Sequence, residues 1–267
     1  MVAIVLAAGY ATRLYPLTLN KPKALLEIGG KPMLDHILEK ILDIKEIKKT
    51  IVVSNGKYYG QFTEWKAAYA NRVSGAGGSG IRTGGSGIRA DGRAVDSFIG
   101  ILNDGTVSEE TRLGAIGDIK YTVEKLSIDD DLFVIAGDNF FTRSLAGFYG
   151  FFKRANADCI TVKRETDPEL LRRVAVAVLD ADSRVIDLAE KPAEPKSDMA
   201  VYAAYMYRRD TLPLFKVYLD EGNPKDSPGN FPSWLYKRRT VAAYPFEGDC
   251  YDIGTVAAYD DICKKFA

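Results

Sequence analysis

A loop close to the start of the chain carries residue types that suit phosphate binding. Gly9 follows an apolar run directly, and Arg13 and Lys23 come soon after it. Small residues allow a nucleotide to approach the backbone, whose N–H groups can hold phosphate oxygens. The Arg guanidinium suits two phosphate oxygens, and the Lys ammonium is a compact charge that can follow a group through its transition state. A glycine turn with two solvated cations explains poorly why Pro16 and Pro22 stiffen the loop around both.

The elements that must position this loop alternate between strand and helix. Apolar runs and helical spacings predict strands at 2–6, 50–54, 98–102 and 132–136 and helices at 33–44, from about Tyr58 to Tyr69, and at 112–126. This alternation is typical of a mostly parallel sheet. Asp138 stands just past the last strand, so its carboxylate should lie at the sheet edge that carries Gly9.

The second half of the chain has a different pattern, in which strands outnumber helices. The β-prone pieces are 159–163, 175–179, 185–188, 200–207 and 241–244. No linker rich in Pro or Gly separates the halves, so we expect one composite domain over 1–267, with a nucleotide-binding half at about 1–140 and a second half at about 141–267. A division into two domains stays open. Phe231 and Trp234 are expected in the core rather than at a subunit contact.

The segment 74–93 interrupts the pattern and is rich in glycine. It contains the sequence GGSGIR at 77–82 and again at 84–89, which is typical of a low-complexity loop. A formal GxGxxG match at 75–80 follows a helical pattern instead of a strand, which disfavours a dinucleotide site. Its arginines could contact phosphate, although a flexible connection, natural or engineered, explains the repeat more simply.

The composition argues against a polyanionic partner. The chain has 267 residues, and 36 Lys and Arg balance 36 Asp and Glu to a formal net charge of +0. Nucleic-acid-binding proteins usually carry a basic surplus, because much of their affinity comes from neutralising phosphates. We therefore expect small-molecule chemistry and no nucleic-acid partner.

The cysteines, the histidine and the first apolar stretch narrow the classes further. Cys159, Cys250 and Cys263 form no CxxC pair and are odd in number, so neither a zinc knuckle nor a disulfide framework is expected, and the cytoplasm fits best. His36 lies in a helical pattern and would have to serve any nucleophilic site alone, which favours a structural role. The stretch 2–8 is too short to span a membrane and follows no basic region, so no membrane partner is expected.

A long motif in the first loop resembles a known family. Residues 6–18 read Leu-Ala-Ala-Gly-x-x-Thr-Arg-Leu-x-Pro-Leu-Thr, and Lys-Pro-Lys follows at 21–23. Together they resemble the signature of the sugar-1-phosphate nucleotidyltransferases, also called NDP-sugar pyrophosphorylases. Four further pieces occur in the order that the family requires, at 113–117, 136–139, 190–192 and 251–255. The resemblance therefore spans nearly the whole chain.

The resemblance implies an α/β fold, a Rossmann-like three-layer αβα sandwich with a mostly parallel mixed sheet in the GT-A-like form of the nucleotidyltransferases. It implies that Arg13 and Lys23 are catalytic and that Asp138 and Asp252 hold Mg²⁺ as the cofactor. Mg²⁺ prefers a few carboxylates together with phosphate oxygens and water. Glu190 and Lys191 would bind the sugar phosphate. The implied nucleotide-binding residues are Leu6, Ala8, Gly9, Asn103, Gly105 and Gly114. For the base, the resemblance points to Gly114, and the segment 103–106 just before it is a further candidate.

The implied reaction joins a nucleoside triphosphate and a sugar 1-phosphate to give an NDP-sugar and pyrophosphate. The attack is in line and Mg-assisted, and it needs no protein nucleophile, which suits a chain with one dispensable histidine. Loss of one stabilising charge should lower the rate by about 10²–10³-fold. The base, the sugar and the number of subunits stay open, and a homo-oligomer is compatible with the sequence.

Some positions depart from the family pattern and predict an altered or narrowed sugar pocket. Ala203 and Ala204 stand where relatives commonly have a glycine, the segment 173–175 replaces a frequent Tyr-Gly, and Cys250 replaces a position that is often aromatic.

Two alternatives follow from the same residues. A non-catalytic relative that senses a sugar or a nucleotide would tolerate the altered pocket, although the retained Arg13, Lys23, Asp138 and Asp252 argue against it. A glycosyltransferase that uses an NDP-sugar would typically carry Asp-x-Asp at the metal strand, and the segment 138–140 reads Asp-Asn-Phe instead.

Overall fold

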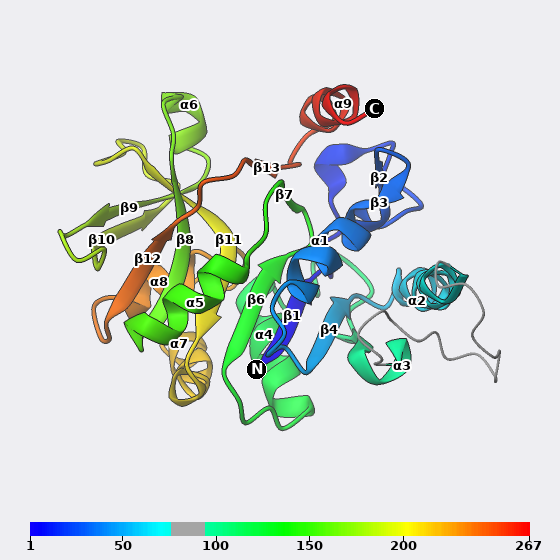
Figure 1. The fold of residues 1–267 in the computed structure, drawn as a ribbon, viewed down its shortest axis with the longest axis horizontal. Helices are drawn as coiled ribbons and strands as arrows, with labels where there is room; N and C mark the ends of the chain where they lie inside the picture. The colour runs from blue at the N-terminus through cyan, green and yellow to red at the C-terminus, as the bar shows by residue number, and fades with distance from the viewer. Residues whose placement is uncertain (76–93) are drawn as a thin grey trace.

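The first half of the chain builds four parallel strands. In the computed structural model, which describes residues 1–75 and 94–267, strand β1 (Val2–Leu6) lies between β4 (Lys49–Ser54) and β6 (Leu132–Ala136), and β5 (Ile99–Asn103) pairs with β4 (Figure 1). Leu6 is in register with Val53 on one side and with Ala136 on the other. The loops that follow these strands therefore emerge at one edge of the sheet, as the alternation predicts.

The second half extends the same sheet with mainly antiparallel pairs. Strand β11 (Met199–Tyr207) pairs antiparallel with β6, with β8 (Asp158–Arg164) and with β9 (Ala175–Leu179). Strand β10 (Val185–Glu190) completes that side, and β12 (Val241–Pro245) runs parallel to β8. One mixed sheet of nine strands thus passes through both halves of the described chain.

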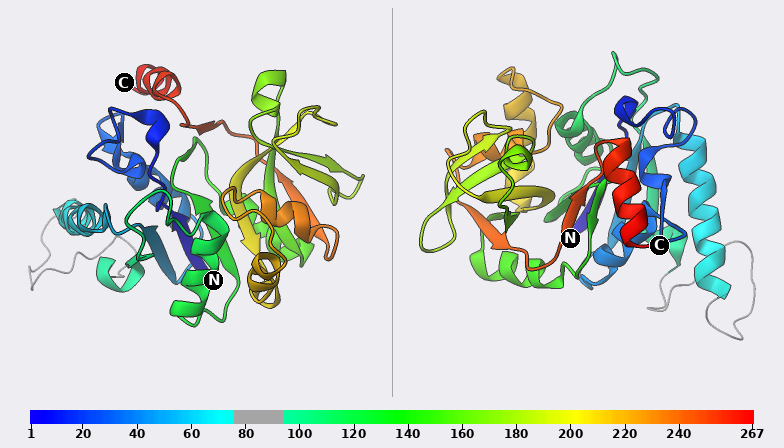
Figure 2. Two further views of the ribbon diagram at one scale, coloured as in Figure 1. Left: turned by 180° about the vertical axis from the view of Figure 1, so that it is seen from behind. Right: turned by 90° about the horizontal axis from the view of Figure 1, so that it is seen from above.

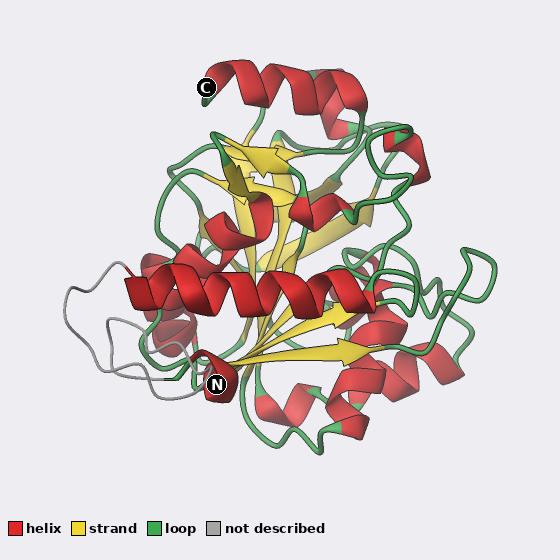
Figure 3. Cartoon of the chain, turned by 90° about the vertical axis from the view of Figure 1, so that its right-hand side faces the viewer, coloured by secondary structure: helices red, strands yellow, loops and turns green. Residues whose placement is uncertain are grey.

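Helices cover both faces of the sheet, which confirms the three-layer α/β fold (Figure 3). Strand side chains alternate between two cores, so that Ala3 and Val5 pack on one face and Ile4 on the other. The first core is covered by α1 (Met33–Leu42), α2 (Tyr59–Gly75), α3 (Val95–Phe98), α5 (Ala146–Ala155) and the short α6 (Pro168–Leu171). The second is covered by α4 (Ala115–Lys125), α7 (Leu214–Asp220) and α8 (Asn230–Leu235).

Short elements that the sequence did not indicate bring the C-terminus back to the first half. Strand β13 (Cys250–Asp252) pairs with β7 (Asn139–Phe141), and α9 (Val256–Lys265) packs against the hairpin of β2 (Glu27–Ile28) and β3 (Lys31–Pro32), as the right-hand view of Figure 2 shows. The Tyr259 hydroxyl donates to Glu27 O at 2.7 Å. This return places Asp252 opposite Asn139, next to Asp138.

His36 and the aromatic pair in the second half have the packing roles that the sequence favoured. His36 lies in α1, where its Nε2 is 3.0 Å from Ile28 O and its ring meets the Phe140 ring edge-on. Burial lowers the pKa of His36. Phe231 is fully buried and stacks on Phe215 at 4.0 Å between ring centroids, and Trp234 is buried beside them.

Three other expectations can be compared with the described residues. Helix α2 runs to Gly75, and the rest of the predicted glycine-rich loop, with its GxGxxG match, lies outside the described residues. The three cysteines are free thiols. None of the helices in the described ranges has the length and apolar character needed to cross a bilayer.

Candidate active site

A cleft of about 500 Å³ crosses the sheet edge where the parallel strands end. Its central part is lined by residues of the β1 and β6 loops and of β13, including Leu6, Ala8, Gly9, Arg13, Lys23, Asp138 and Asp252. One end is lined by Tyr10, Asp104, Glu109, Arg112, Gly114 and Asp118, and the other by Arg173, Ala175, Glu190, Lys191, Tyr202 and Ala203. The cleft thus brings together residues from both halves of the chain.

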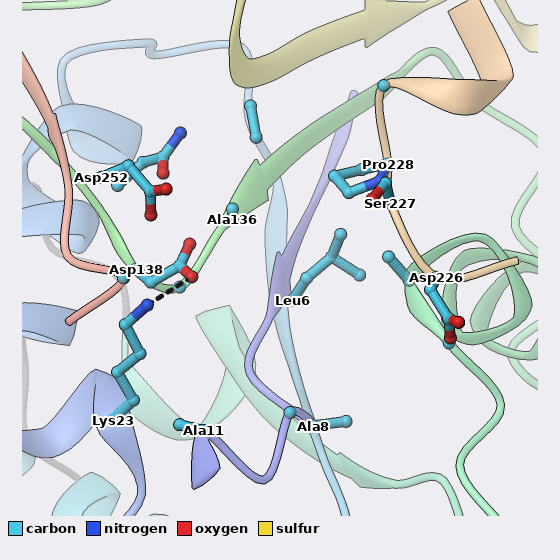
Figure 4. Close-up of a pocket in the computed structure, with 18 of the residues that line it drawn as sticks. Leu6, Ala8, Ala11, Lys23, Ala136, Asp138, Asp226, Ser227, Pro228 and Asp252 are labelled. Carbon is cyan, nitrogen blue, oxygen red and sulfur yellow. Dashed lines mark hydrogen bonds and ion pairs between the residues drawn. The ribbon is translucent and has the colours of Figure 1, made fainter. Parts of the chain in front are cut away.

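Two carboxylates and a lysine meet at the centre of the cleft. Lys23 Nζ contacts Asp138 Oδ2 at 2.7 Å, and the backbone N–H of Ile253 donates to Asp138 O at 3.2 Å, which ties β13 to the loop after β6. Figure 4 shows the side chains of Asp138 and Asp252 near one another, with Lys23 bound to Asp138. The two acids are far apart in sequence, and the β7–β13 pair brings them together.

The donor set at this centre fits a divalent cation. The Asp252 side chain is open to the cleft although protein surrounds it, and within the described ranges it has no hydrogen bond or ion pair. Burial, and then the charge of Asp138, raise the pKa of Asp252 to about 6. A cation bound between two carboxylates would remove the repulsion between their negative charges. No group of three or more His, Cys, Asp or Glu that could hold a metal occurs among the described residues, but Mg²⁺ needs only one or two carboxylates when phosphates and water complete its shell.

The loop after β1 is held in place by hydrogen bonds from its neighbours. The Ala7 N–H donates to Val53 O at 3.0 Å, and the fully buried Asn55 donates from Nδ2 to Ala8 O at 2.8 Å. A Cβ atom added to Gly9 would meet nothing within 4 Å, so the loop faces open space at this residue. The geometry leaves room for a ligand at the backbone, as the sequence predicted.

Arg13 and Lys23 both line the cleft but differ in their surroundings. Arg13 lies in a short 3₁₀ helix (Thr12–Leu14), is exposed, and has no hydrogen bond or ion pair with any described residue. Lys23 begins a second such helix (Lys23–Leu25), and its side chain is only 13% exposed in its pair with Asp138. Arg13 is therefore available to an incoming anion, whereas Lys23 already balances a carboxylate.

At one end of the cleft, the structure places Asp104 rather than its two neighbours at the cleft wall. Asn103 Oδ1 accepts from Gly105 N at 2.8 Å, so the Asn103 side chain closes its own turn, and neither residue lines the cleft. Gly114 does line it and has φ of 80°, and a Cβ atom there would lie 2.7 Å from Lys225 O. Only glycine fits that position. The roles predicted for Asn103, Gly105 and Gly114 in nucleotide binding stay predictions.

At the other end, Glu190 and Lys191 lie together as the sequence predicted. Lys191 Nζ is 3.6 Å from Glu190 Oε1 and donates to Ser227 Oγ at 3.2 Å. Burial raises the pKa of Glu190, and the charge of Lys191 opposes the rise. Lys191 has φ of 48°, a left-handed conformation that is rare for a residue with a side chain and that clusters at functional sites.

The positions that depart from the family pattern line this same end. Ala175 and Ala203 face the cleft, while Ala204 and Cys250 are buried beside it. The register of β11 against β8 shifts between Tyr202 and Tyr205, a β-bulge that includes Ala203. The methyl groups of Ala175 and Ala203 occupy cleft volume that a glycine would leave open.

Sequence reasoning missed several residues of the cleft wall. Tyr10 and Asp118 were not singled out, and Asp104 was included only as part of the candidate segment 103–106. The segment Asp226, Ser227, Pro228 and Gly229 was not considered either, and Figure 4 shows its first three side chains across the cleft from Asp138 and Asp252. Asp118 gave a readable signal, because it falls on the face of α4 that carries Ile119 and Thr122, which the helical spacing marks as buried.

The fold and the cleft define a class, an α/β protein in which a parallel half and a mainly antiparallel half meet at one cleft lined by Arg13, Lys23, Asp138 and Asp252. The chain belongs to the nucleotidyl transferase family, whose model matches residues 2–267. The resemblance to sugar-1-phosphate nucleotidyltransferases is thereby confirmed.

Relatives with assigned names cover 78% to 97% of the chain. A protein of Sulfolobus acidocaldarius assigned as a mannose-1-phosphate guanyltransferase is 30% identical, with 96% of this chain and 60% of the relative covered. The UTP–glucose-1-phosphate uridylyltransferase AglF of Haloferax volcanii is 27% identical, with 78% and 72% covered. A glucose-1-phosphate adenylyltransferase of Geobacter metallireducens is 26% identical, with 97% and 64% covered. The chain spans less than two thirds of the first and third of these relatives.

Solved structures show the same fold at lower identity. A UDP-glucose pyrophosphorylase complexed with UDP-glucose superposes with a TM-score of 0.77 at 18% identity, covering 100% of this chain and 98% of that one. A protein of Bacillus anthracis assigned as a glucose-1-phosphate thymidylyltransferase gives a TM-score of 0.75 at 22% identity, covering 100% and 95%.

Proposed function

We propose that the chain is a sugar-1-phosphate nucleotidyltransferase, which joins a nucleoside triphosphate to a sugar 1-phosphate and releases pyrophosphate. The observation that carries the proposal is the centre of the cleft, where Asp138, Asp252, Lys23 and Arg13 lie between two differently lined ends. The names of the relatives describe this class of reaction with different bases and sugars.

The reaction that suits this centre is an in-line displacement. An oxygen of the sugar phosphate forms a bond to the α-phosphorus, and the bond from that phosphorus to the bridging oxygen breaks, so that pyrophosphate leaves with the electron pair. The attacking oxygen is already an anion, so no protein nucleophile or general base is needed. The work of the protein is to position two polyanions and to stabilise charge.

The residues of the cleft divide this work. The unpaired Arg13 would bind phosphate oxygens, and Lys23 would hold a positive charge beside them. Asp138 and Asp252 would hold Mg²⁺, which supplies charge neutralisation on the phosphates. Gly9 and the backbone around it would accommodate the triphosphate, while Glu190 and Lys191 would bind the hydroxyls and phosphate of the sugar.

The residues that depart from the family pattern at the Glu190 end of the cleft favour a second candidate function, the binding of a sugar or nucleotide without catalysis. The methyl groups of Ala175 and Ala203 narrow the end that holds Glu190, and a relative that only senses a sugar or nucleotide would tolerate such narrowing. We further propose a cytoplasmic location, supported by the three free thiols and by the nucleoside triphosphate that the reaction needs. Neither nucleic acid nor a membrane is part of the proposal.

The test is pyrophosphate release with Mg²⁺ across a grid of nucleoside triphosphates and sugar 1-phosphates. Turnover with one or a few pairs of triphosphate and sugar 1-phosphate is the expected result and identifies both substrates. A folded protein that binds triphosphate without turnover would favour the sensing relative. A folded protein that neither binds nor turns over any triphosphate would overturn the proposal.

A further inference from the structure

Three buried acidic and hydroxyl groups gather at the end of the cleft beyond the β1 loop. Asp104 is 7% exposed, Asp118 is 6% exposed and Tyr10 is 7% exposed, and all three line the cleft. They come from different elements, namely the turn after β5, the first turn of α4 and the loop after β1. Polar groups with so little exposure are normally satisfied by hydrogen bonds within the protein.

Two of these groups lack such partners. Asp118 Oδ1 and the Tyr10 hydroxyl oxygen are buried without a hydrogen bond of normal geometry among the described residues, although Asp118 lies beside Asp104 and Tyr10 beside Thr106. Asp104 is better satisfied, because its Oδ1 accepts from Thr106 N at 2.7 Å and from Thr106 Oγ1 at 2.8 Å, and its Oδ2 lies 3.0 Å from the same hydroxyl. An unpaired buried polar atom costs about 1–3 kcal/mol unless a ligand completes it. The orphan atoms therefore mark a place where a ligand should supply hydrogen bonds.

No cation neutralises the two acids directly. In the part of the chain that the structure describes, neither Asp104 nor Asp118 forms an ion pair, although cations lie close by. Arg112 forms ion pairs with other acids, from Nη1 to Glu109 Oε1 at 2.8 Å and from Nε to Asp226 Oδ1 at 3.1 Å. Lys225 Nζ donates to Arg112 O at 2.8 Å. The acids are thus left to share a proton with each other or to accept from a ligand.

The electrostatics agree with a shared proton. Burial, followed by the charge of Asp104 and a hydrogen bond to it, raises the pKa of Asp118 to about 8, and Lys225 opposes the rise. With that proton held between the two carboxyls, the oxygens that do not carry it remain as acceptors only. The Tyr10 hydroxyl can donate.

We propose that Asp118, acting together with Asp104, is the base-specificity residue of the nucleotide site, and that the pair selects guanine. This inference rests on the proposed function, and it names the nucleoside triphosphate that the enzyme would use. The N1–H and 2-amino groups of guanine donate to the acid pair, and the Tyr10 hydroxyl donates to O6.

The choice of guanine follows from the donors that each base offers on one edge. Guanine presents two neighbouring N–H donors beside a carbonyl, which matches two acceptors beside a hydroxyl. Adenine and cytosine place a ring nitrogen acceptor next to their amino group, and uracil and thymine flank one N–H with two carbonyls. Each of these edges would point at least one acceptor at the acid pair. A well-formed pair of such hydrogen bonds favours the correct base over a wrong one by about tenfold to a hundredfold in affinity.

The first measurement is kcat/KM for GTP, ATP, UTP, CTP and inosine triphosphate with one fixed sugar 1-phosphate, accompanied by equilibrium binding of the same nucleotides. Inosine triphosphate lacks only the 2-amino group of GTP. We expect GTP to be preferred over ATP by about tenfold or more, and over inosine triphosphate by a smaller factor in the same direction.

Two variants of Asp118 separate hydrogen bonding from packing. Asp118→Asn keeps an outward acceptor, because its amide can donate to Asp104, and it should keep the preference for GTP over ATP. Asp118→Leu has a similar volume and no acceptor, and the preference should fall by about tenfold or more. Glu124→Gln is the matched control, because it changes a carboxylate on the exposed face of the same helix.

The outcomes distinguish this inference from the proposed function. Turnover with UTP, ATP or CTP preferred, or an unchanged preference in Asp118→Leu, would refute the guanine assignment and leave the reaction class intact. Selective binding of guanine nucleotides without turnover would support the assignment while refuting catalysis. A wild-type protein that binds no nucleotide would refute both.

Discussion

Replacement of Asp118 by Asn should make the protein more stable at neutral pH. Asp118 is buried, and its pKa is raised from 3.8 to about 8 in the folded protein. Between these values the unfolded chain releases the proton and the folded protein keeps it, so the free energy of unfolding falls as pH rises. At pH 7 this amounts to at most about 4 kcal/mol, since each pKa unit corresponds to about 1.4 kcal/mol. Asn cannot ionise and avoids the loss.

The assay is urea unfolding followed by tryptophan fluorescence at several pH values between 4 and 9. The advantage of Asp118→Asn over the wild type should be small near pH 4, grow up to pH 8 and then level off. Asp158, whose pKa is raised to about 6 mainly by burial, titrates equally in both proteins and cancels from the difference. A difference that is constant across this range, or a variant less stable at pH 7, would show that Asp118 is ionised in the folded protein and would refute the reasoning.

Three more outcomes are expected. Asp138→Asn should lower turnover by at least about 10²–10³-fold with little change in the thermal midpoint, and a fully active variant in the pyrophosphate assay would remove Asp138 from the metal site. Gly229→Ala should raise KM for the sugar 1-phosphate more than KM for the triphosphate, because its Cβ atom would collide with Glu190 Oε2; equal KM changes for both substrates would contradict this. The chain should unfold in a single urea transition, since one sheet passes through both halves, and two separated transitions would argue for two domains.

The parallel part of the fold could be predicted from the sequence because its signals are local. The runs 2–6 and 132–136 became β1 and β6 with the expected bounds, and the remaining expected strands were found within a residue or two. The pair of β7 and β13 could not be predicted in this way. Each is three residues long, and they are joined only by contacts between distant parts of the chain.

Some residues of the candidate site could also be predicted from local sequence signals, and others could not. Arg13, Lys23 and Asp138 follow strands whose ends are readable, and the structure brings them into one cleft. The sequence pointed to Asn103 at the far end, whereas its side chain closes a turn and Asp104 faces the cleft. Side chains alternate between the two faces of a sheet along a strand, but this rule ends where the strand ends. It therefore cannot predict which residue of the following turn faces the cleft.

The segment 225–229 touches both ends of the cleft and has a thermodynamic consequence. Its Lys225 carbonyl accepts from the Ile116 N–H at 3.0 Å at the proposed base end, and its Ser227 hydroxyl accepts from Lys191 at 3.2 Å at the other. A displacement of this five-residue stretch at one end would be felt at the other, because both ends are hydrogen-bonded. Occupancy of one end of the cleft would then alter affinity at the other, and linkage would require the effect to be equal in both directions. Under the proposed function, the triphosphate and the sugar 1-phosphate would be coupled through the backbone of this stretch.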